Sequence, residues 1–509
     1  MSRTQKFLKN TVTTALLQVV TMLSGFIIPK VMLSVYGSEI NGLVTSISQF
    51  ISYLTLVEAG LSGATVYSLY RPIANRDIDA VNRVLSAARN FYYGTGYIFL
   101  GLVSGLGLLY PMLVKTQELS YHEVVFLFFI LGVNGVLEFF TLAKYRVLLT
   151  ADQRTYVISL ASIVQTIIHV SVIAILPYYG ASIVFVRFIA ISAILIRTVI
   201  LWAYCRRKYR FLDFSAEPDY SSMDKRWDAL YFQIIGVIHN GAPVMIATFF
   251  LSLHDVSVYS IYAMVIIGIN SILSIFTSGL AASFGDLIAR GEKDGFRRAF
   301  RQFEYVFYMI LTSVYAITMV TYSPFIRVYT LGADINYSYP VLAILMTING
   351  YLYNLKTPYG MLTISAGKYR ESRFQITIQG LLEIVCGSIL SLVWGIKGIV
   401  VGSIISNLYR DINFIFFAPK HLTHYSFLPS LMLWLRSLGT GILVVIIARY
   451  IPTGFVNDYK SWFAYASIVG VISVMITLSV NIALDLSLFK EVCRQIRSVL
   501  AVQKAKRDS

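Results

Sequence analysis

Long apolar segments separated by short polar connections dominate the chain. Each segment has about 20 residues or more, the length that an α-helix needs to cross the hydrocarbon core of a bilayer. They lie at residues 11–36, 41–69, 87–114, 122–148, 156–177, 182–204, 229–252, 256–283, 302–322, 338–364, 373–394, 396–418, 429–451 and 461–486. The pattern therefore predicts an all-α membrane protein with about 14 transmembrane helices.

The first twelve predicted helices form two sets of six that repeat at an offset of about 215 residues. The matching positions are Ile73, Ala74, Asp79, Arg83, Asn134, Gly135, Ala151 and Gly180, which pair with Ile288, Ala289, Asp294, Arg298, Asn349, Gly350, Ala366 and Gly395. Duplicated halves are typical of secondary transporters. We predict two pseudo-symmetric six-helix lobes at 1–204 and 229–418, a cytoplasmic linker at 205–228, two further helices within 429–486, and a basic cytoplasmic tail at 487–509.

Composition agrees with a lipid environment. Hydrophobic residues make up 57% of the chain and charged residues 13%, against about 25% charged in soluble domains. Cys205, Cys386 and Cys493 are odd in number and far apart, so they predict neither a disulfide framework nor a metal site, and we interpret them as packing residues.

The formal net charge of +16 is explained by orientation. If the N-terminus is cytoplasmic, most Lys and Arg residues fall in cytoplasmic connections and in both tails, as the positive-inside rule requires. This orientation places both termini in the cytoplasm and brings the basic connections to anionic membrane lipids. The sequence has no aromatic-basic pattern of an RNA-binding sheet, so we expect no nucleic acid partner.

Basic residues inside the predicted helices are not explained by orientation, and they are Lys30, Arg187, Arg197, Lys356, Arg436 and Arg449. A charge at the bilayer centre costs at least about 2.5–3.5 kcal/mol and by default marks a functional site. Lys30, Arg197 and Lys356 lie deepest, and we expect a bend at Pro29. Arg187 and Arg449 lie near helix ends, from where a long side chain reaches the outer interface.

Lys356 has polar neighbours on its own helix face. Asn349 and Tyr353 precede it by seven and three residues, which places all three on one side of a helix. Pro358 follows and predicts a break or kink. A cation beside two hydrogen-bonding groups suits an anionic headgroup. The alternative is a lysine that reaches the inner interface past the bend.

Acidic residues and a histidine inside the predicted helices form a second set of candidates. Glu58, Glu138 and Glu383 are carboxylates at membrane depth, and His169 lies mid-helix. Such groups suit coupling to H⁺ or Na⁺, so we consider them candidate ion-coupling residues. The alternative is that each acid forms a structural ion pair with one of the basic residues, and that His169 is a packing residue.

Enzyme signatures are missing from the sequence. It has no GxxxxGK[ST] phosphate-binding loop, no HExxH motif, and no polar loop rich in acids and histidines that could hold a metal. A membrane glycosyltransferase or polysaccharide polymerase is the alternative from another class, but the outer connections are too short for a catalytic domain. We expect a transporter with no cofactor other than a coupling ion.

Two segments resemble a known family. YGSEINGLVTSISQFISYLTLVEAGLSGATVYSLY (Tyr36–Tyr70) is similar to the second-helix signature of bacterial polysaccharide flippases, and KYRVLLTADQRTYV (Lys144–Val157) is similar to the inner end of their fourth helix. These are the Wzx-type oligosaccharide flippases of the multidrug/oligosaccharidyl-lipid/polysaccharide exporter superfamily. The chain looks closest to capsule and exopolysaccharide members from Gram-positive bacteria, and the resemblance extends over essentially the whole chain.

The resemblance implies a monomer in the bacterial cytoplasmic membrane, with two lobes around a central cavity and alternating access. It implies a polyprenyl-diphosphate-linked oligosaccharide as substrate. Lys30, Arg197, Lys356 and Arg187 are candidate ligands of the diphosphate, with Asn349 and Tyr353 beside Lys356. Helices 429–451 and 461–486 would hold the prenyl tail, as the last two helices do in lipid II flippases.

Two related transport functions are alternatives. A lipid II flippase is the first, although Gly25-Phe26 and Pro29-Lys30 stand where that flippase's first helix carries an Arg-Asp pair. A cation-coupled multidrug exporter is the second. Its usual twelve helices and acidic lumen contrast with the extra helix pair and the basic residues here.

Overall fold

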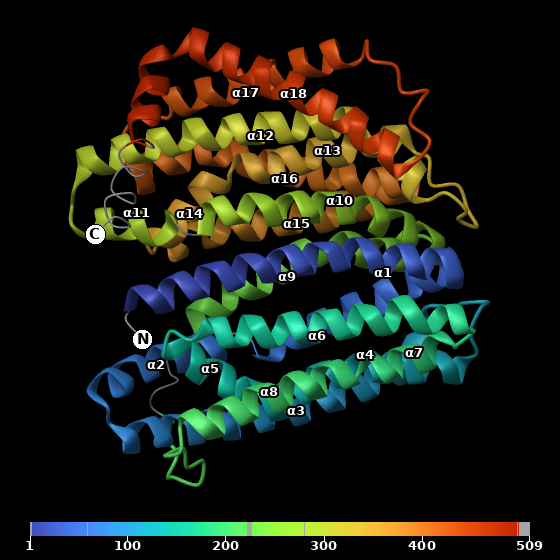
Figure 1. Ribbon diagram of the computed structural model, residues 1–509, viewed down its shortest axis with the longest axis vertical. Helices are drawn as coiled ribbons and strands as arrows, with labels where there is room; N and C mark the ends of the chain where they lie inside the picture. Colours follow the sequence, from blue (N-terminus) through green and yellow to red (C-terminus); the bar gives the residue numbers. More distant parts are fainter. Residues whose placement is uncertain (1–2, 59, 221–225, 279, 496, 498–509) are drawn as a thin grey trace. The chain divides into compact units, whose positions relative to one another are not determined.

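The computed structural model describes residues 3–58, 60–220, 226–278, 280–495 and 497, and within them the fold is all-helical, which confirms the predicted fold class (Figure 1). Part of the linker (221–225) and of the basic tail (498–509) lies outside the described residues. The α-helices are α1 (Arg3–Leu54), α2 (Leu61–Asn75), α3 (Ile78–Leu113), α4 (Tyr121–Leu137), α5 (Ala143–Ala151), α6 (Thr155–Ile175), α7 (Ile183–Ala190), α8 (Ser192–Lys208), α9 (Arg226–Phe250), α10 (Leu253–Ser278), α11 (Leu280–Ala289), α12 (Lys293–Tyr329), α13 (Pro340–Leu355), α14 (Thr357–Ser365), α15 (Tyr369–Trp394), α16 (Ile396–Ala418), α17 (Leu428–Ala448) and α18 (Tyr459–Leu484).

Twelve helical stretches in the described residues are long and apolar enough to cross a membrane, against fourteen predicted segments. The first stretch, Leu8–Asn75, has 68 residues and contains both of the first two predicted segments. It is not broken at Pro29, where we expected a bend; the non-helical residue is Gly37, with φ 79°. The predicted segment 338–364 is divided into α13 and α14, of 16 and 9 residues, each shorter than one crossing.

The chain divides into two compact units. The first contains Met1–Met264 with Gly332–Asn336 and Gly387–Ile399, and the second contains Val265–Leu331, Tyr337–Cys386 and Val400–Ser509. Helix α9 follows the linker but packs against α1, and it therefore belongs to the first unit. The lobe boundaries drawn from the sequence repeat and the cytoplasmic location of the termini stay predictions.

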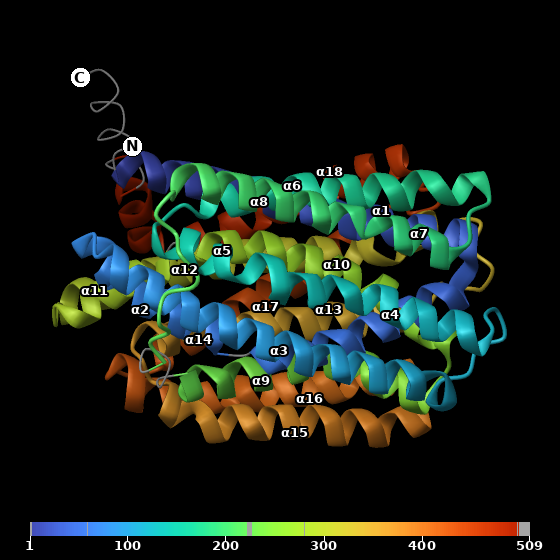
Figure 2. The same ribbon diagram turned by 90° about the horizontal axis from the view of Figure 1, so that it is seen from below.

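In the first unit, α1 packs along α6, α6 along α8, and α3 along α4 (Figures 1 and 2). Phe99 is fully buried between α3 and α4, with its ring 5.1 Å from that of Phe139. A Cβ atom on Gly135 would lie 2.6 Å from the Phe99 ring, so only glycine allows α4 to approach α3 so closely. Interfaces between membrane helices commonly use small residues in this way.

In the second unit, α12 packs against α13, α17 and α18. Hydroxyl groups connect these helices inside the apolar surroundings: Thr312 and Ser437 lie 2.6 Å apart, and Tyr351 donates to Ser437 at 2.9 Å. Trp434 donates its indole N–H to Tyr308 at 2.7 Å. The additional helices α17 and α18 are therefore an integral part of the second unit.

The sequence repeat corresponds to a repeated interruption of one helix. In the first unit a π-helical turn, Glu138–Leu142, separates α4 from α5. In the second unit Lys356 separates α13 from α14, with Pro358 in the first turn of α14 as expected. The offset of 215 residues carries Thr141 of the π turn onto Lys356. Ala151 and Ala366, which match at the same offset, both lie at the end of the short second helix.

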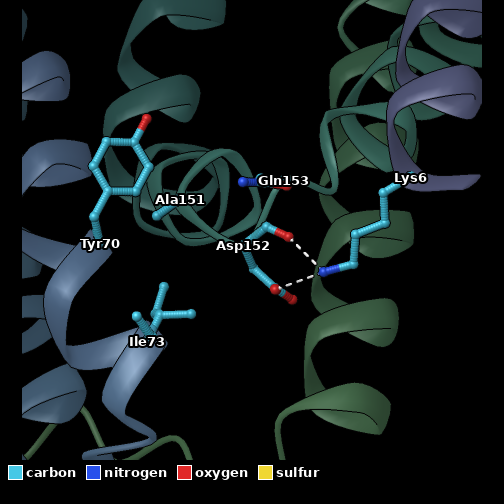
Figure 3. Close-up of a pocket in the computed structure, with 7 residues that line it drawn as sticks. Lys6, Tyr70, Ile73, Ala151, Asp152 and Gln153 are labelled. Atoms are coloured by element: carbon cyan, nitrogen blue, oxygen red, sulfur yellow. Dashed lines mark hydrogen bonds and ion pairs between the residues drawn. The ribbon is translucent and has the colours of Figure 1, made fainter. Parts of the chain in front are cut away.

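At one end of the first unit, Asp152 holds three segments together. Figure 3 shows its contact with Lys6. Lys6 of α1 contacts both its carboxylate and its carbonyl oxygen at 2.9 Å, Tyr209 donates to the carboxylate at 2.6 Å, and Arg154 pairs with it. Burial alone would raise the pKa of Asp152, but hydrogen bonds from Tyr209, Lys6 and Arg154 outweigh burial and hold that pKa below its usual value.

We expect Asp152→Asn to lower the free energy of unfolding at pH 7 by about 1.5–3 kcal/mol, because charge-assisted hydrogen bonds are lost. Since the folded-state pKa is depressed, this stabilisation is present above the ordinary pKa of about 4 and is lost as the pH falls through the folded-state value. Unfolding in detergent as a function of pH measures it. The exposed Asp213→Asn is the control, and an equal stability deficit of Asp152→Asn at every pH would contradict the prediction.

Candidate functional site

The interrupted helix of the first unit positions Glu138. The π turn holds one residue more per turn than an α-helix, and such turns are frequent at functional sites. Glu138 is the first residue of this turn, and Thr141 lies 3.1 Å from Thr198 of α8 through their hydroxyl oxygens. The turn therefore aims a carboxylate toward α8 in the middle of an otherwise apolar helix.

Four charged side chains form a network at this turn. Arg146 of α5 donates to Glu138 at 2.6 Å and to Glu58 at 2.8 Å. Arg197 of α8 lies 3.3 Å from the second oxygen of Glu138 and donates to Gln165 of α6 at 3.2 Å. Two acids and two guanidinium groups balance in charge. This geometry is that of a structural ion pair, which is the alternative given above for Glu58 and Glu138.

Arg146 is not among the residues selected from the sequence, because it lies near the end of its predicted helix. A basic residue at that position ordinarily contacts the membrane surface. One signal was present. Arg146 follows Glu138 by eight residues, which is about two turns, and therefore shares its helix face.

The interrupted helix of the second unit positions Lys356. Its ammonium group donates to Asn407 of α16 and lies 5.0 Å from the centre of the Tyr353 ring. Asn407 donates in turn to Asn349 at 2.8 Å, and Gln379 of α15 donates to Asn407 at 3.2 Å. The structure thus brings together Lys356, Asn349 and Tyr353, as their spacing predicts, and adds two amide side chains from other helices.

Two charged residues of α16 beside this cluster were also missed. Arg410 donates to Ser372 of α15 and to Asn413, and its guanidinium carbon lies 4.2 Å from the centre of the Phe414 ring. Asp411 is 2% exposed. The signal was simple: adjacent charges stand inside the predicted segment 396–418. Neither residue is among the buried charges predicted from the sequence.

Arg187 lines a cavity of about 340 Å³ in the first unit. The polar residues around this cavity are Asn41, Thr45, Ser48 and Gln49, all from α1. Arg187 is 7% exposed, so its side chain turns into the unit rather than toward the outer interface. One guanidinium nitrogen lies 3.7 Å from the sulfur of Met32, and Nε has no hydrogen-bond partner in the described part of the chain. Among the described residues, Arg187 forms no ion pair with a carboxylate.

The remaining candidates lie apart from these three groups. Lys30 follows Pro29, which lines the Arg187 cavity, and is partly buried. His169 is partly buried within the electrostatic reach of Arg187. Glu383 is buried and accepts a hydrogen bond from Ser403 at 2.8 Å. Arg436 is partly buried, Arg449 is exposed, and the three cysteines are free thiols.

Comparison with known proteins identifies the fold. No protein-family profile matches the sequence. No curated protein matches it either. The lipid II flippase MurJ in an inward closed conformation superimposes with a TM-score of 0.66 at 13% identity, over 93% of this chain and 98% of that one. An inward-facing multidrug resistance MATE transporter of the MOP superfamily gives 0.59 at 13% identity, over 78% and 96%.

A third match has a TM-score of 0.57 at 13% identity, over 85% of this chain and 96% of the other. It is a MOP superfamily transporter from Pyrococcus furiosus, described as having a binding pocket of reversed polarity. The chain has the MOP transporter fold. These identities establish the fold and leave the substrate to the chemistry of the chain's own residues.

We expect Arg146→Met to destabilise the protein by about 3 kcal/mol, because it leaves the partly buried Glu58 and Glu138 without their shared cation. Adding Glu58→Gln removes the acid that has lost its only cation among the described residues, while Glu138 keeps Arg197, and should restore at least half of the loss. Unfolding of the single and double variants in detergent measures both effects. A loss below about 1 kcal/mol for Arg146→Met would show that the network contributes little to stability.

Proposed function

We propose that this chain is a flippase that translocates a polyprenyl-diphosphate-linked oligosaccharide from the inner to the outer leaflet of the bacterial cytoplasmic membrane, for capsule or exopolysaccharide synthesis. The observation that carries the proposal is Arg187, a buried cation beside a polar cavity with no carboxylate partner among the described residues. Alternating access is the proposed mode of transport, and the proposed working unit is a monomer.

A buried charge without a partner is costly, so such a group is normally paired or binds a ligand of opposite charge. The other deep arginine, Arg197, shows the contrast, because Glu138 and Gln165 already occupy its guanidinium group. Arg187 is therefore suited to phosphate oxygens, which guanidinium groups bind in a fork geometry. An organic cation would be repelled from the same cavity, which disfavours a multidrug exporter.

Sugars and a prenyl chain need different surroundings. Asn41 and Gln49 provide amide groups beside Arg187 for sugar hydroxyls. Helices α17 and α18, which α12 binds through hydroxyl contacts, are the proposed surface for the prenyl tail. The solved lipid II flippase covers 93% of this chain, and MATE transporters cover 78% to 86%. This difference in coverage supports a lipid-linked substrate.

Lipid II is the second candidate substrate, and the similarity to the MurJ flippase favours it. Both substrates carry a diphosphate between a prenyl chain and a sugar, so Arg187 serves either one. The sugar and peptide portion distinguishes them. Coupling of transport to an H⁺ or Na⁺ gradient, and contact of the basic connections with anionic lipids, belong to the same proposal.

The test is leaflet translocation in proteoliposomes with a fluorescent polyprenyl-diphosphate oligosaccharide. We expect transport by the wild type and a loss of about 10- to 100-fold in substrate affinity for Arg187→Gln, because a charged hydrogen bond contributes about 1.5–3 kcal/mol. Arg449→Gln is the matched control, since Arg449 is exposed at the end of α17.

Competition decides between the alternatives. If unlabelled lipid II inhibits translocation and the unlabelled lipid-linked oligosaccharide does not, lipid II is the substrate. Transport of an organic cation, with no movement of the lipid-linked sugar, would refute the flippase proposal. Unchanged affinity in Arg187→Gln would remove Arg187 from the binding site.

A further inference from the structure

The carboxylate of Asp411 is anomalous for a buried acid. It is 2% exposed, and neither of its oxygens receives a hydrogen bond in the part of the chain that the structure describes. Buried polar groups nearly always have a partner, and an isolated buried charge is strongly unfavourable. The site therefore calls for a positively charged ligand or for neutralisation of the acid.

We propose that Asp411 is a proton-binding site, and that Lys356 couples its protonation to the binding of an anionic diphosphate headgroup. This inference rests on the proposed function, and it names the coupling ion and the residue that carries it. Its residues all lie in the second unit, where Lys356 is a further phosphate-binding cation besides Arg187.

The titratable groups that act on Asp411 lie on α12, on α13, on α16 and at the α13–α14 interruption, and Glu383 of α15 acts on Lys356. Lys356 at the α13–α14 interruption and Arg410 of α16 are the cations that act on it. Tyr351 of α13 and Tyr308 of α12 are the neutral titratable groups within its reach. Neither cation contacts the carboxylate directly, because Lys356 donates to Asn407 and Arg410 donates to Ser372 and Asn413. The carboxylate thus lies near two positive charges, and no described residue donates a hydrogen bond to it.

A proton fits this site better than a metal ion. Two nearby cations repel Na⁺, whereas a proton removes the charge of Asp411 and needs a single oxygen. The neighbouring amide oxygen of Asn407 already accepts from Lys356 and from Gln379, which leaves it a poor metal ligand. Within the described residues there is also no group of three or more His, Cys, Asp or Glu side chains that could hold a metal.

Lys356 provides the link to substrate because it is partly buried, whereas Asp411 is enclosed. When the headgroup is absent, the charge of Lys356 stabilises the Asp411 carboxylate. A diphosphate oxygen at Lys356 competes for that charge and adds a like charge near Asp411. Asp411 then takes up one proton from solvent to form the neutral acid. Proton and anion therefore bind cooperatively, and by linkage each increases the affinity for the other.

The first experiment detects the proton directly. Infrared difference spectra of the detergent-solubilised protein, recorded as a function of pH, should show the carbonyl band of a protonated carboxylic acid that Asp411→Asn removes. Glu304→Gln is the matched control, because Glu304 of the same unit is equally buried at 2% exposed but accepts hydrogen bonds from Tyr359 at 2.7 Å and Ser430 at 2.9 Å. If Asp411→Asn leaves every titrating band in place, the proton site is refuted.

The second experiment measures the linkage with undecaprenyl diphosphate as the probe. Calorimetry in buffers of different ionisation enthalpy should show proton uptake on binding. The dissociation constant should rise by up to about tenfold per pH unit above the point where the free protein loses the proton. Asp411→Asn should abolish both effects, and Glu304→Gln should retain them. Lys356→Met should keep the infrared band but lose the proton uptake, which provides a second variant if Asp411→Asn fails to fold.

The outcomes separate the two proposals. Binding of undecaprenyl diphosphate without proton uptake, or with uptake that persists in Asp411→Asn, overturns the inference and leaves the proposed function intact. A titrating Asp411 band with no binding of undecaprenyl diphosphate at any pH overturns the proposed function and the coupling to substrate. The proton site itself would then stand.

Discussion

Charge compensation inside an apolar helical bundle is the constraint on which the rest of this structure depends. Lipid around the helices offers no solvation to a charged group, so each such group must find its partner within the protein or in a ligand. In the first unit, Arg146 pairs directly with Glu58 and Glu138. Among the residues that the structure describes, Arg187 and Asp411 contact no group of opposite charge, and this difference separates structural charges from candidate sites.

Helix interruption is the device that places these charges. A continuous apolar helix presents the same kinds of side chain along its length, whereas a π turn or a break alters which residues face the bundle. The first unit uses the π turn to direct Glu138, and the second uses the α13–α14 break at Lys356. Broken helices form the substrate and ion sites of many secondary transporters, where backbone irregularity borders a cavity. The Glu138 network and the Lys356 cluster of this chain each lie at a helix interruption of this kind.

Sequence alone predicted the elements better than the partners. The apolar segments followed from hydrophobic length, and the association of Lys356 with Asn349 and Tyr353 followed from helical spacing, because both properties are local. Asp411 lay inside a predicted helix and was overlooked, and no spacing rule connects it to Lys356, which lies on another helix. Helix α1 is interrupted at Gly37 and not at Pro29, where a bend was expected. Gly37 has a positive φ, which glycine adopts readily, whereas the backbone at Pro29 stays helical.

Two helices approach each other closely within each unit, and this bears on the origin of the units. Gly135 and Gly350 match at the repeat offset, and a Cβ atom on either would lie within 2.8 Å of an aromatic ring, that of Phe99 or of Tyr315. The interrupted helix that carries each glycine is shared as well. Glu138 and its counterpart Tyr353, in contrast, have no chemistry in common. If one ancestral half was duplicated, the glycine contact and the broken helix are inherited, and the charges were acquired separately in each copy.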